Sequence, residues 1–313
     1  MSRKVSICIP CYNNAAEVKC LLDSIYCQDY TDFEVNISDD STENATERLV
    51  REHYSGVNYC HNTKPYGHIF NWNAAIRMAQ GTYIKIMFSD DWFTFPDSLG
   101  KLVELLDKNP NAVLAFSGSR QVMLDGQNIN TLHHASAQET NSYDRFADND
   151  FIEGLRGDYR NLFLGNQIGA PSAVLYRRGS ELTFFDERSN WASDMFLYFD
   201  LLTKNPVFAY TKEPLISIGV HEKQYTESFS ENDLRIYKDY RYMYLKYHLQ
   251  ESAACSAYFT EKFLLKYHRG LQEAKELGIS KHMFFQKWFA EQKAAVQCFL
   301  QNRMRLYRTG RKQ

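Results

Sequence analysis

Strands and helices alternate along the chain from Val5 to Phe116, and this alternation limits the possible fold more than any other feature. Short apolar segments have the composition of strands, and segments with one apolar helical face separate them. The expected strands are Val5–Ile9, Phe33–Ile37, Val57–Cys60, Tyr83–Phe88 and Ala112–Phe116. The expected helices are Asn14–Gln28, with Asn14 as N-cap, then Glu43–His53, Ile69–Ala79 and Pro96–Leu106. Such a chain forms a mostly parallel central sheet flanked by helices, so we predict an α/β fold.

The next part of the chain is less regular. A pair of strands is expected around the turn Asp125-Gly126, and the polar, turn-rich residues Asn128–Asp150 predict a surface loop or lid. The pattern then returns with a strand at Ser172–Tyr176, a helix at Ala192–Thr203 and a strand at Leu215–Val220.

The character of the sequence changes after His221. No strand pattern follows, and the long runs Leu234–Leu249, Ala254–Leu277 and Lys281–Leu306 are typical of helices. Since 313 residues exceed an average domain, we predict an α/β domain at residues 1–225 and a helical C-terminal extension at residues 226–313.

Composition excludes several classes of protein. The net charge of −2 and a pI near 6.5 argue against a nucleic-acid partner. The N-terminus has no apolar export signal, and no run is long enough to span a membrane. Seven cysteines, an odd number in expected core segments, indicate reduced thiols. We therefore expect a cytoplasmic enzyme without transmembrane helices.

The C-terminus suggests a membrane contact. After Glu291 the acidic side chains end, and basic residues continue among aromatic ones to Lys312. A basic amphipathic helix of this kind can lie on the inner face of the cytoplasmic membrane, although a solvated helix end fits the composition equally well.

Polar residues follow three expected strands. Pro10, Tyr12 and Asn13 come after the first strand, Asp39-Asp40 after the second, and Asp90-Asp91 after the strand at Tyr83–Phe88. The carboxyl ends of parallel strands meet at the edge where α/β sheets bind ligands. Adjacent carboxylates there favour a divalent cation that holds a phosphate.

These loops also have the groups for a nucleotide pocket. A carboxylate such as Asp40 can accept the N3–H of uracil, and the ring of Tyr12 can stack on a base. Neither G-x-x-x-x-G-K nor G-x-G-x-x-G follows a strand, which argues against ATP hydrolysis and dinucleotide-dependent redox chemistry. A turn with a helix N-cap is the alternative for Asp39–Thr42.

The segments with these residues resemble the N-terminal half of family 2 glycosyltransferases with the GT-A fold. The matching stretches, in order, are VSICIPCYNN, FEVNISDDSTENAT, GHIFNWNAAI and YIKIMFSDDWFTFPDSL. The resemblance covers residues 4 to 120 strongly and extends more loosely to about residue 221. It implies an inverting transfer of a sugar from a nucleotide-diphosphate donor, usually a UDP-sugar, with Mn²⁺ or Mg²⁺ as cofactor.

The resemblance also implies roles for individual residues. Pro10, Tyr12, Asn13, Asp40 and Asn73 would contact the nucleotide. The acids form a DXD-type motif in which Asp90 would approach the ribose and metal region and Asp91 would ligate the metal. The family often has a basic residue just before Asn73, where this chain has Trp72.

A general base must take the proton of the acceptor hydroxyl during attack. In similar enzymes this carboxylate begins a helix roughly a hundred residues after the metal motif. The matching segment here is NWASDMFLYFDLL, which makes Asp194 the expected base, with Asp186 and Glu187 as alternatives. His221 follows the last strand, where related enzymes often have an additional metal or diphosphate ligand.

These residues predict a metal-dependent, hexosyltransferase-like enzyme of bacterial surface polysaccharide assembly, such as O-antigen or capsule. The acceptor would be a saccharide or a lipid-linked saccharide, and residues Gly165–Ser172 resemble loops on the acceptor side. A nucleotide-sugar-binding module without catalysis is the first alternative. A sugar nucleotidyltransferase is the second, although PCYNNAAE lacks the basic Gly-rich loop of that class.

Overall fold

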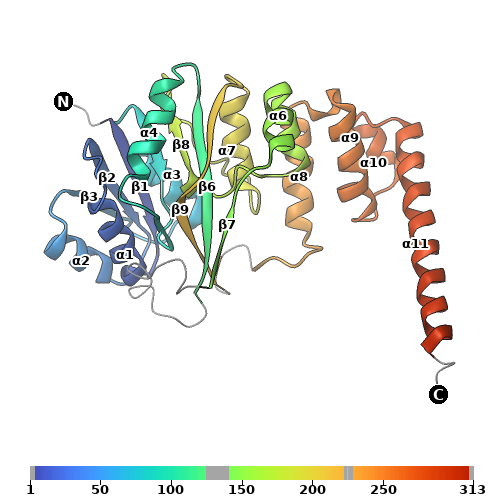
Figure 1. The fold of residues 1–313 in the computed structure, drawn as a ribbon, viewed down its shortest axis with the longest axis horizontal. Coiled ribbons are helices and arrows are strands. Elements are labelled where there is room, and N and C mark those ends of the chain that lie inside the picture. Colours follow the sequence, from blue (N-terminus) through green and yellow to red (C-terminus); the bar gives the residue numbers. More distant parts are fainter. Residues whose placement is uncertain (1–3, 125–140, 222–223, 225–227, 310–313) are drawn as a thin grey trace. The chain divides into compact units, whose positions relative to one another are not determined.

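The computed structural model describes residues 4–124, 141–221, 224 and 228–309 (Figure 1). The chain forms two compact units, residues 1–230 and residues 231–313. None of the helices in these described ranges is long and apolar enough to cross a bilayer.

The first unit is built on one sheet. Its strands, among the described residues, follow the order β3-β2-β1-β4-β8-β6-β9-β5, and β7 pairs with β6 beside β8. The bounds are β1 Val5–Cys11, β2 Phe33–Asp39, β3 Val57–His61, β4 Tyr83–Ile86, β5 Asp91–Phe93, β6 Leu114–Met123, β7 Ser142–Arg145, β8 Val174–Arg177 and β9 Phe208–Val220.

The sheet is mixed. β1 to β4 pair in parallel, as the alternation predicts, and β6 and β9 are also parallel. β8 runs antiparallel to both β4 and β6, and β5 and β7 are antiparallel to their partners. The sheet is therefore parallel in its N-terminal half, as predicted, and mixed in its C-terminal half, where antiparallel strands join the parallel pair β6 and β9.

Helices cover both faces of the sheet (Figure 1). On one face α1, α2 and α4 pack their apolar sides against the main core; in α4 these residues are Leu99, Leu102, Val103 and Leu106, with helical spacing. On the other face α3 lies behind β1 and β2, where Ser6 of β1 accepts hydrogen bonds from the amides of Gln80 and Gly81. The helix bounds are α1 Ala15–Tyr26, α2 Ala45–His53, α3 His68–Arg77, α4 Ser98–Lys108, α6 Asn149–Gly157 and α7 Ser193–Leu202, with 3-10 helices at Tyr159–Leu164 and Pro171–Ala173.

Several predicted boundaries are wrong. The strand expected at Ala112–Phe116 extends to Met123, and β7 and α6 lie within or just after the loop expected at Asn128–Asp150. The remainder of that loop, with the turn Asp125-Gly126, lies outside the described residues. Asn14 occupies the N-cap position of α1, but its side chain does not cap the helix.

The second unit is helical. It contains α8 Leu234–Lys246, a 3-10 turn at Leu249–Glu251, α9 Ala253–Phe259, a π-helix at Thr260–Leu265, α10 Leu271–Glu276 and α11 Lys281–Thr309. The prediction of a single helix at Ala254–Leu277 is wrong, because a turn follows the π-helix and His268 in that turn adopts a left-handed backbone with a φ of 54°. One stripe of tyrosines on α8 is buried, which confirms that it packs in a core; its members are Tyr237, Tyr240, Tyr244 and, just after the helix, Tyr247.

Candidate functional site

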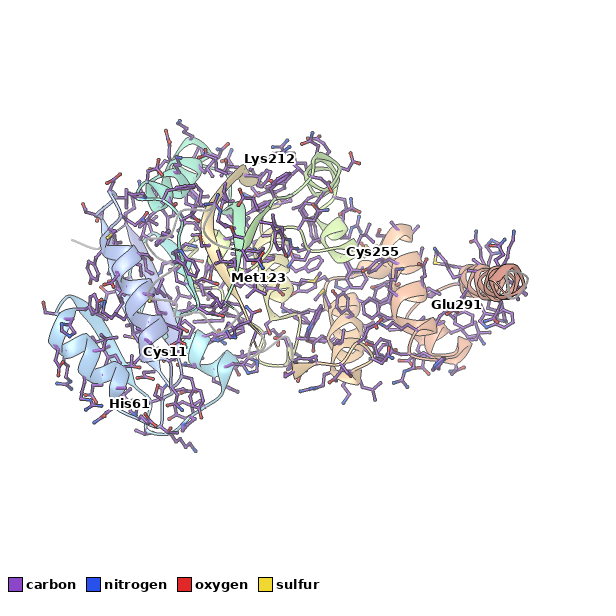
Figure 2. The ribbon with its side chains drawn as sticks, turned by 60° about the horizontal axis from the view of Figure 1, so that its bottom comes forward. Cys11, His61, Met123, Lys212, Cys255 and Glu291 are labelled. Atoms are coloured by element: carbon purple, nitrogen blue, oxygen red, sulfur yellow. The ribbon has the colours of Figure 1, made fainter. Side chains whose placement is uncertain are left out.

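The carboxyl ends of β1, β2 and β3 lie at one level of the sheet. Cys11 pairs with Asp39, and Asp39 pairs with His61 in parallel register. Cys11 and His61 accordingly lie near one another at one end of the unit in Figure 2. The amide of Met87, just after β4, donates to the Cys8 carbonyl of β1. The polar loops predicted from the sequence therefore come to one edge.

Asn13 joins the loop after β1 to the loop after β2. Its backbone is left-handed, with a φ of 52°, and its amide donates to Ser41 Oγ at 2.7 Å. Its side chain donates to Thr42 Oγ1 at 3.1 Å and accepts from the Thr42 amide at 3.0 Å. Asn14 then donates to Ser89 Oγ, beside the acidic pair. Asn13 thus braces the loops, and the nucleotide contact predicted for it would compete with these bonds.

The ring of Tyr12 has the freedom that base stacking needs, since 53% of the residue is exposed. Pro10 lies in β1, buried and paired with Ser38. The nucleotide contacts of Tyr12 and Pro10 stay predictions. Tyr12 is open to a ligand from solvent, whereas Pro10 is enclosed in the strand.

Asp40 already accepts three hydrogen bonds from its own loops. Its Oδ1 accepts from Asn62 Nδ2 at 2.7 Å, and its Oδ2 accepts from the amides of Tyr66 and Gly67, both at 2.9 Å. This arrangement holds the loop before α3, and a base could use Asp40 only through a remaining lone pair or an exchanged partner.

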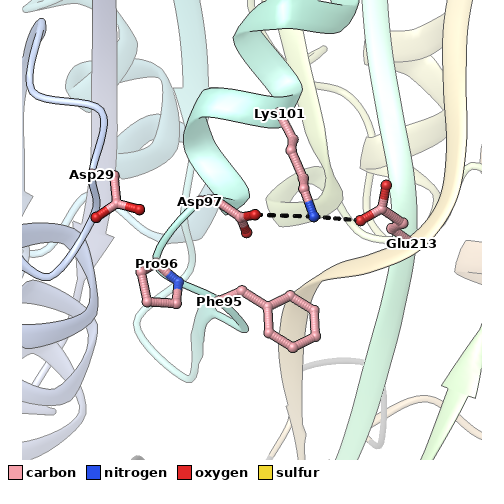
Figure 3. Close-up of a pocket in the computed structure, with 6 residues that line it drawn as sticks. All are labelled: Asp29, Phe95, Pro96, Asp97, Lys101 and Glu213. Carbon is pink, nitrogen blue, oxygen red and sulfur yellow. Dashed lines mark hydrogen bonds and ion pairs between the residues drawn. The ribbon is translucent and has the colours of Figure 1, made fainter.

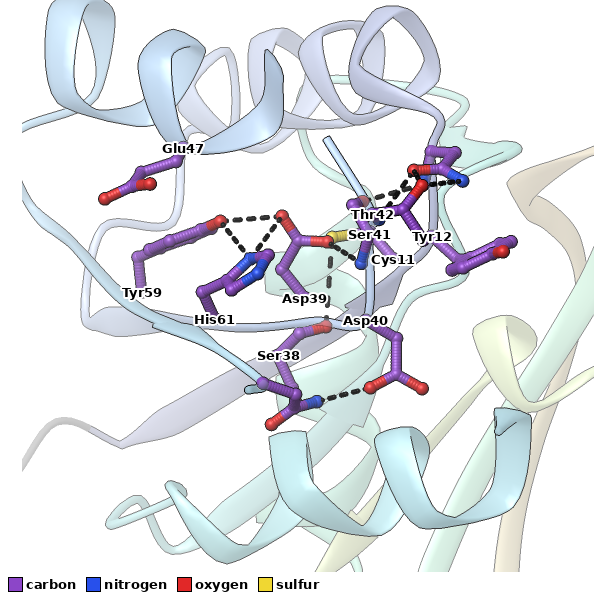
Figure 4. A network of polar contacts seen from close by, with 12 residues as sticks. Cys11, Tyr12, Ser38, Asp39, Asp40, Ser41, Thr42, Glu47, Tyr59 and His61 are labelled. Atoms are coloured by element: carbon purple, nitrogen blue, oxygen red, sulfur yellow. Dashed lines mark hydrogen bonds and ion pairs between the residues drawn. The ribbon is translucent and has the colours of Figure 1, made fainter. Parts of the chain in front are cut away.

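The neighbouring Asp39 is fully buried in a second network (Figure 4). Tyr59 Oη donates to its Oδ2 at 2.6 Å, the Ser41 amide donates to its Oδ1 at 2.8 Å, and His61 Nδ1 lies 3.9 Å away. Burial together with this bond raises the pKa of Tyr59, which keeps the phenol protonated as a donor. The two adjacent acids therefore hold two different loops.

Asn73 lies in the core, so the nucleotide contact expected for it is not available to its side chain. It is 1% exposed, donates to the Phe185 carbonyl at 3.0 Å and accepts from the Phe185 amide at 2.9 Å. Trp72, which stands where the family often has a basic residue, packs against the rings of Phe88 and Phe185. This part of α3 stabilises the fold and brings no positive charge to the site.

Asp90 and His221 form the accessible part of the acidic site. Asp90 Oδ2 lies 3.3 Å from His221 Nε2, and their side chains are 25% and 30% exposed. β5 and β9 bring them together, since the Gly219 amide donates to the Asp90 carbonyl at 3.2 Å. A Cβ at Gly219 would overlap that carbonyl, so only glycine permits this approach.

Asp91 lies behind this pair and is 3% exposed. Burial raises the pKa of Asp91 well above its ordinary value, and the charge of Asp90 adds to this effect. The Ser172 hydroxyl, the Gly219 amide and the Lys85 ammonium act in the opposite direction. The structure thus contains one accessible and one buried carboxylate where the sequence shows two equivalent ones.

Lys85 is a buried cation that the sequence analysis does not identify. It is fully enclosed in β4, donates to the carbonyl oxygens of Ser172 and Val174, and lies 5.7 Å from the centre of the Phe93 ring. Burial lowers its pKa to about 7, against the influence of Asp91. A lysine in an alternating strand pattern looks solvent-facing, so no sequence signal marks it.

Asp194 lies in the first turn of α7 and is partly buried. Its Oδ2 accepts from Asn166 Nδ2 at 2.6 Å, and its Oδ1 accepts from the Met195 amide at 2.8 Å. Burial raises the pKa of Asp194 to about 6, and these bonds together with the charge of Arg145 limit the rise. A carboxylate with this pKa is mostly ionised at pH 7 and able to take a proton.

The alternative bases are engaged elsewhere. Asp186 accepts from the amide and guanidinium of Arg188, and Glu187 lies 3.6 Å from Arg77. The pairing of both acids with arginines favours Asp194 among the three.

The loop Gly165–Ser172 connects the two acidic positions. Asn166 bonds Asp194, and Ser172 Oγ accepts from the Phe88 amide at 3.1 Å, just before the Asp90-Asp91 pair. Tyr198 of α7 fixes the loop by donating to the Gly169 carbonyl at 2.9 Å. The two glycines and a proline indicate the loop in the sequence, but the roles of Asn166 and Ser172 depend on long-range contacts.

A separate pocket lies beside α4 (Figure 3), and none of the predicted site residues lines it. Its one lysine, Lys101, pairs with Asp97 at 3.1 Å and Glu213 at 2.6 Å, so the charge is neutralised within the protein. The candidate site is therefore the edge of the sheet where the carboxyl ends of β1, β2 and β4 meet.

Comparison with known proteins places this geometry in a family. The family described as glycosyl transferase family 2 matches residues 6–181, more than half of the chain. The chain belongs to glycosyl transferase family 2. The matched range includes the loops after β1, β2 and β4 and the loop Gly165–Ser172.

Several bacterial proteins are similar in sequence. An uncharacterized glycosyltransferase of Haemophilus influenzae is 32% identical over 123 residues, which cover 39% of this chain and 40% of that relative. An uncharacterized glycosyltransferase of Rickettsia prowazekii is 24% identical over 83% of this chain and 77% of its own length. The chondroitin synthase of Escherichia coli is 31% identical over 40% of this chain but only 18% of its own length.

Solved structures share the fold. TarS of S. aureus in complex with UDP-GlcNAc aligns with a TM-score of 0.59 at 17% identity, covering 91% of this chain and 79% of that one. The mannosyltransferase PcManGT from Pyrobaculum calidifontis, in complex with GDP-Man and Mn²⁺, aligns with a TM-score of 0.55 at 17% identity, covering 92% and 84%. The likeness confirms the predicted GT-A fold of this glycosyltransferase.

Proposed function

We propose that this glycosyltransferase moves a sugar, with inversion, from a UDP-sugar to a hydroxyl of a saccharide acceptor. One observation carries the proposal: the loop Gly165–Ser172 bonds the expected base, Asp194, at one end and contacts the acidic pair at the other. The expected base and the acidic pair are thereby both held by one segment of the chain.

The residues present fit a divalent cation. Asp90, Asp91 and His221 offer carboxylate oxygens and an imidazole, which suit Mn²⁺, and Mg²⁺ would use the carboxylates. In the described part of the chain no group of three such side chains is already gathered. A cation that takes its other ligands from a diphosphate fits such an incomplete protein set. When bound, the ion stabilises the negative charge of the leaving nucleotide.

In the proposed mechanism Asp194 removes the proton from the acceptor hydroxyl as the oxygen attacks the anomeric carbon. Asn166 holds the carboxylate in one orientation, and the Met195 amide occupies its second oxygen. Inversion follows because the base acts from the face opposite the leaving nucleotide.

Tyr12, Pro10 and Asp40 form the proposed nucleotide side of the site. The exposed ring of Tyr12 stacks on the base, while Asn13 and Asn73 hold the surrounding segments in place. UDP is the proposed nucleotide because TarS, which shares the fold, has been solved with UDP-GlcNAc and with UDP.

The proposed acceptor class comes from sequence similarity. Similarity to chondroitin synthases of two bacteria favours a saccharide or lipid-linked saccharide acceptor in bacterial surface polysaccharide assembly. The chain spans only a small part of these relatives' length, so the proposal names no specific substrate of theirs.

Calorimetry with UDP tests the donor site. Wild-type protein should bind UDP more tightly in Mn²⁺ than in EDTA, and Asp90→Asn and Asp91→Asn should each remove the effect of the metal. Asp97→Asn, at an exposed acid that lines the separate pocket beside α4, is the control and should bind UDP as the wild type does. Metal-independent binding by the wild type would contradict the proposed cation.

A further inference from the structure

Strand β7 lies beside Asp194 and contacts no substrate in the proposed mechanism. β7 pairs with β6 through Ser119↔Arg145 and Gln121↔Tyr143. Because side chains alternate along a strand, Tyr143 and Arg145 project to one face and Asp144 to the other. The ion pair between Asp144 and its strand partner Arg120, at 2.9 Å, agrees with this direction for Asp144.

The strand register places this face on the same side as the acidic site. Tyr143 pairs with Gln121, Gln121 with Ile218, and Ile218 with Asp91, so these four residues form one row across the sheet. Three strand spacings separate the ends of the row, about 14 Å. Asp91 and Tyr143 thus lie on the same face of the sheet, at the two ends of this row, with the buried Ile218 between them.

Arg145 links β7 to the expected base. Its Nη2 donates to the Asn166 carbonyl at 3.0 Å, and the Asn166 side chain in turn bonds Asp194. Arg145 is exposed, and within the described residues no carboxylate lies within 4.0 Å of its guanidinium. The guanidinium therefore has donors available beside the position where an acceptor hydroxyl must approach.

Tyr143 is also open to solvent, with 57% of the residue exposed. An exposed tyrosine two positions from an available arginine, on one face of an edge strand, offers an aromatic face and a planar cation together. Aromatic faces suit sugar rings, and a guanidinium binds carboxylates and phosphates through two parallel hydrogen bonds.

We propose that Tyr143 and Arg145 form the acceptor subsite, and that the acceptor is a saccharide with an anionic group, either a carboxylate or a phosphate. The inference rests on the proposed transfer reaction and names its acceptor class. The sugar ring stacks on Tyr143, and Arg145 binds the anionic group while the neighbouring hydroxyl faces Asp194.

The same arginine could act only by stabilising ionised Asp194, so the test must separate the two roles. Binding of three probes is measured by saturation-transfer NMR in the presence of UDP and Mn²⁺: p-nitrophenyl β-glucuronide, its methyl ester and p-nitrophenyl glucoside 6-phosphate. The ester keeps the ring and removes the charge. The two anionic arms distinguish a carboxylate from a phosphate.

The proposal predicts that the wild type binds at least one anionic probe about 10-fold or more tightly than the ester, the scale of a charge-assisted hydrogen bond. Arg145→Gln should reduce this ratio to about one, and Tyr143→Ala should weaken the charged and neutral probes alike. Arg51→Gln, at an exposed arginine paired with Glu47 on α2, removes the same charge and should change neither.

UDP binding in the same samples keeps the two hypotheses apart. If UDP does not bind, the proposed function fails. If UDP binds and the wild type fails to prefer an anionic probe over the ester, including by binding neither, the acceptor proposal is overturned. It is also overturned if Arg145→Gln retains the preference, since Arg145 would then act only through Asp194.

Discussion

The protonation state of Asp194 depends on opposing effects of burial and of neighbouring groups on its pKa. Burial raises its pKa, while Asn166, the Met195 amide and Arg145 stabilise the ionised form, so that the pKa lies at about 6. The carboxylate is thus basic enough to accept a proton and still mostly ionised at pH 7.

Replacing Asp194 should separate binding from chemistry. Asp194→Asn should lower transfer by roughly 10² to 10⁴, the usual loss for a positioned base, and leave UDP affinity nearly unchanged. Steady-state kinetics and calorimetry on the same variant measure the two quantities. A collapse of UDP affinity together with the rate would place Asp194 in the donor pocket.

The pH dependence of the reaction follows from the same pKa. Only the ionised form of Asp194 accepts a proton, so kcat/KM should rise with pH up to about 6 and then level off. In Asp194→Asn the residual activity should lack this limb. An acid limb of unchanged position in the variant would assign the titration to another group.

Stability should show the opposite dependence. The folded pKa, about 6, lies above the ordinary value of 3.8, so folding favours the protonated form. Ionised Asp194 therefore lowers the stability of the fold as pH rises from about 4 to 6, by up to about 3 kcal/mol. Asp194→Asn should raise the melting temperature at pH 8 more than at pH 4, and scanning calorimetry measures both. An equal shift at both pH values would contradict the raised pKa.

At the scale of elements, buried amides join segments that are distant in the sequence. Asn73 connects α3 to Phe185 by two hydrogen bonds. Asn73→Ala should cost roughly 2 to 4 kcal/mol of unfolding free energy, because two buried backbone groups lose their partners. Urea unfolding tests this, with exposed Asn109→Ala as control; a cost equal to that of the control would mean that water replaces the amide.

The elements that local patterns predict are those with strong periodicity. β1 to β4 and the helices α1 to α4 lie near their predicted places because apolar spacing alone specifies them. β7 was missed because Ser142–Arg145 is polar and becomes a strand only through its pairing with β6. The π-helix at Thr260–Leu265 was missed because its residues have ordinary helical spacing.

The candidate site was predictable in position more than in detail. Three strand-end loops could be placed at one edge from topology alone. The sequence could not separate the buried Asp91 from the accessible Asp90, nor show that Asn73 is enclosed. Both facts depend on packing between segments far apart in the chain.

At the scale of the whole molecule, the sheet unit contains every residue of the proposed reaction. The helical unit exposes large apolar side chains. Along α11, exposed apolar side chains recur with helical spacing at Phe285, Trp288 and Phe289. This pattern and the basic residues after Glu291 are typical of a helix on a membrane surface, so the peripheral membrane contact stays a prediction.

Liposome sedimentation measures that contact. Full-length protein should sediment with anionic vesicles at low salt, and the attraction should fade as screening shortens its range to about 10 Å at 0.1 M. Deleting residues Arg303–Gln313 or changing Phe289 to Ser should weaken it without affecting UDP-sugar hydrolysis. Full-length protein that stays in the supernatant at low salt would exclude the contact.

The central claim is that the sheet unit is a metal-dependent donor site for a UDP-sugar with Asp194 as base. Release of UDP from a panel of UDP-sugars, followed over hours in Mn²⁺ and in EDTA, tests it most directly. We expect slow hydrolysis of at least one donor in Mn²⁺ and its loss in EDTA and in Asp91→Asn, while circular dichroism shows that the variant keeps its fold. Hydrolysis at wild-type rate by Asp91→Asn at saturating Mn²⁺, or none of the donors turned over by the wild type, would contradict it.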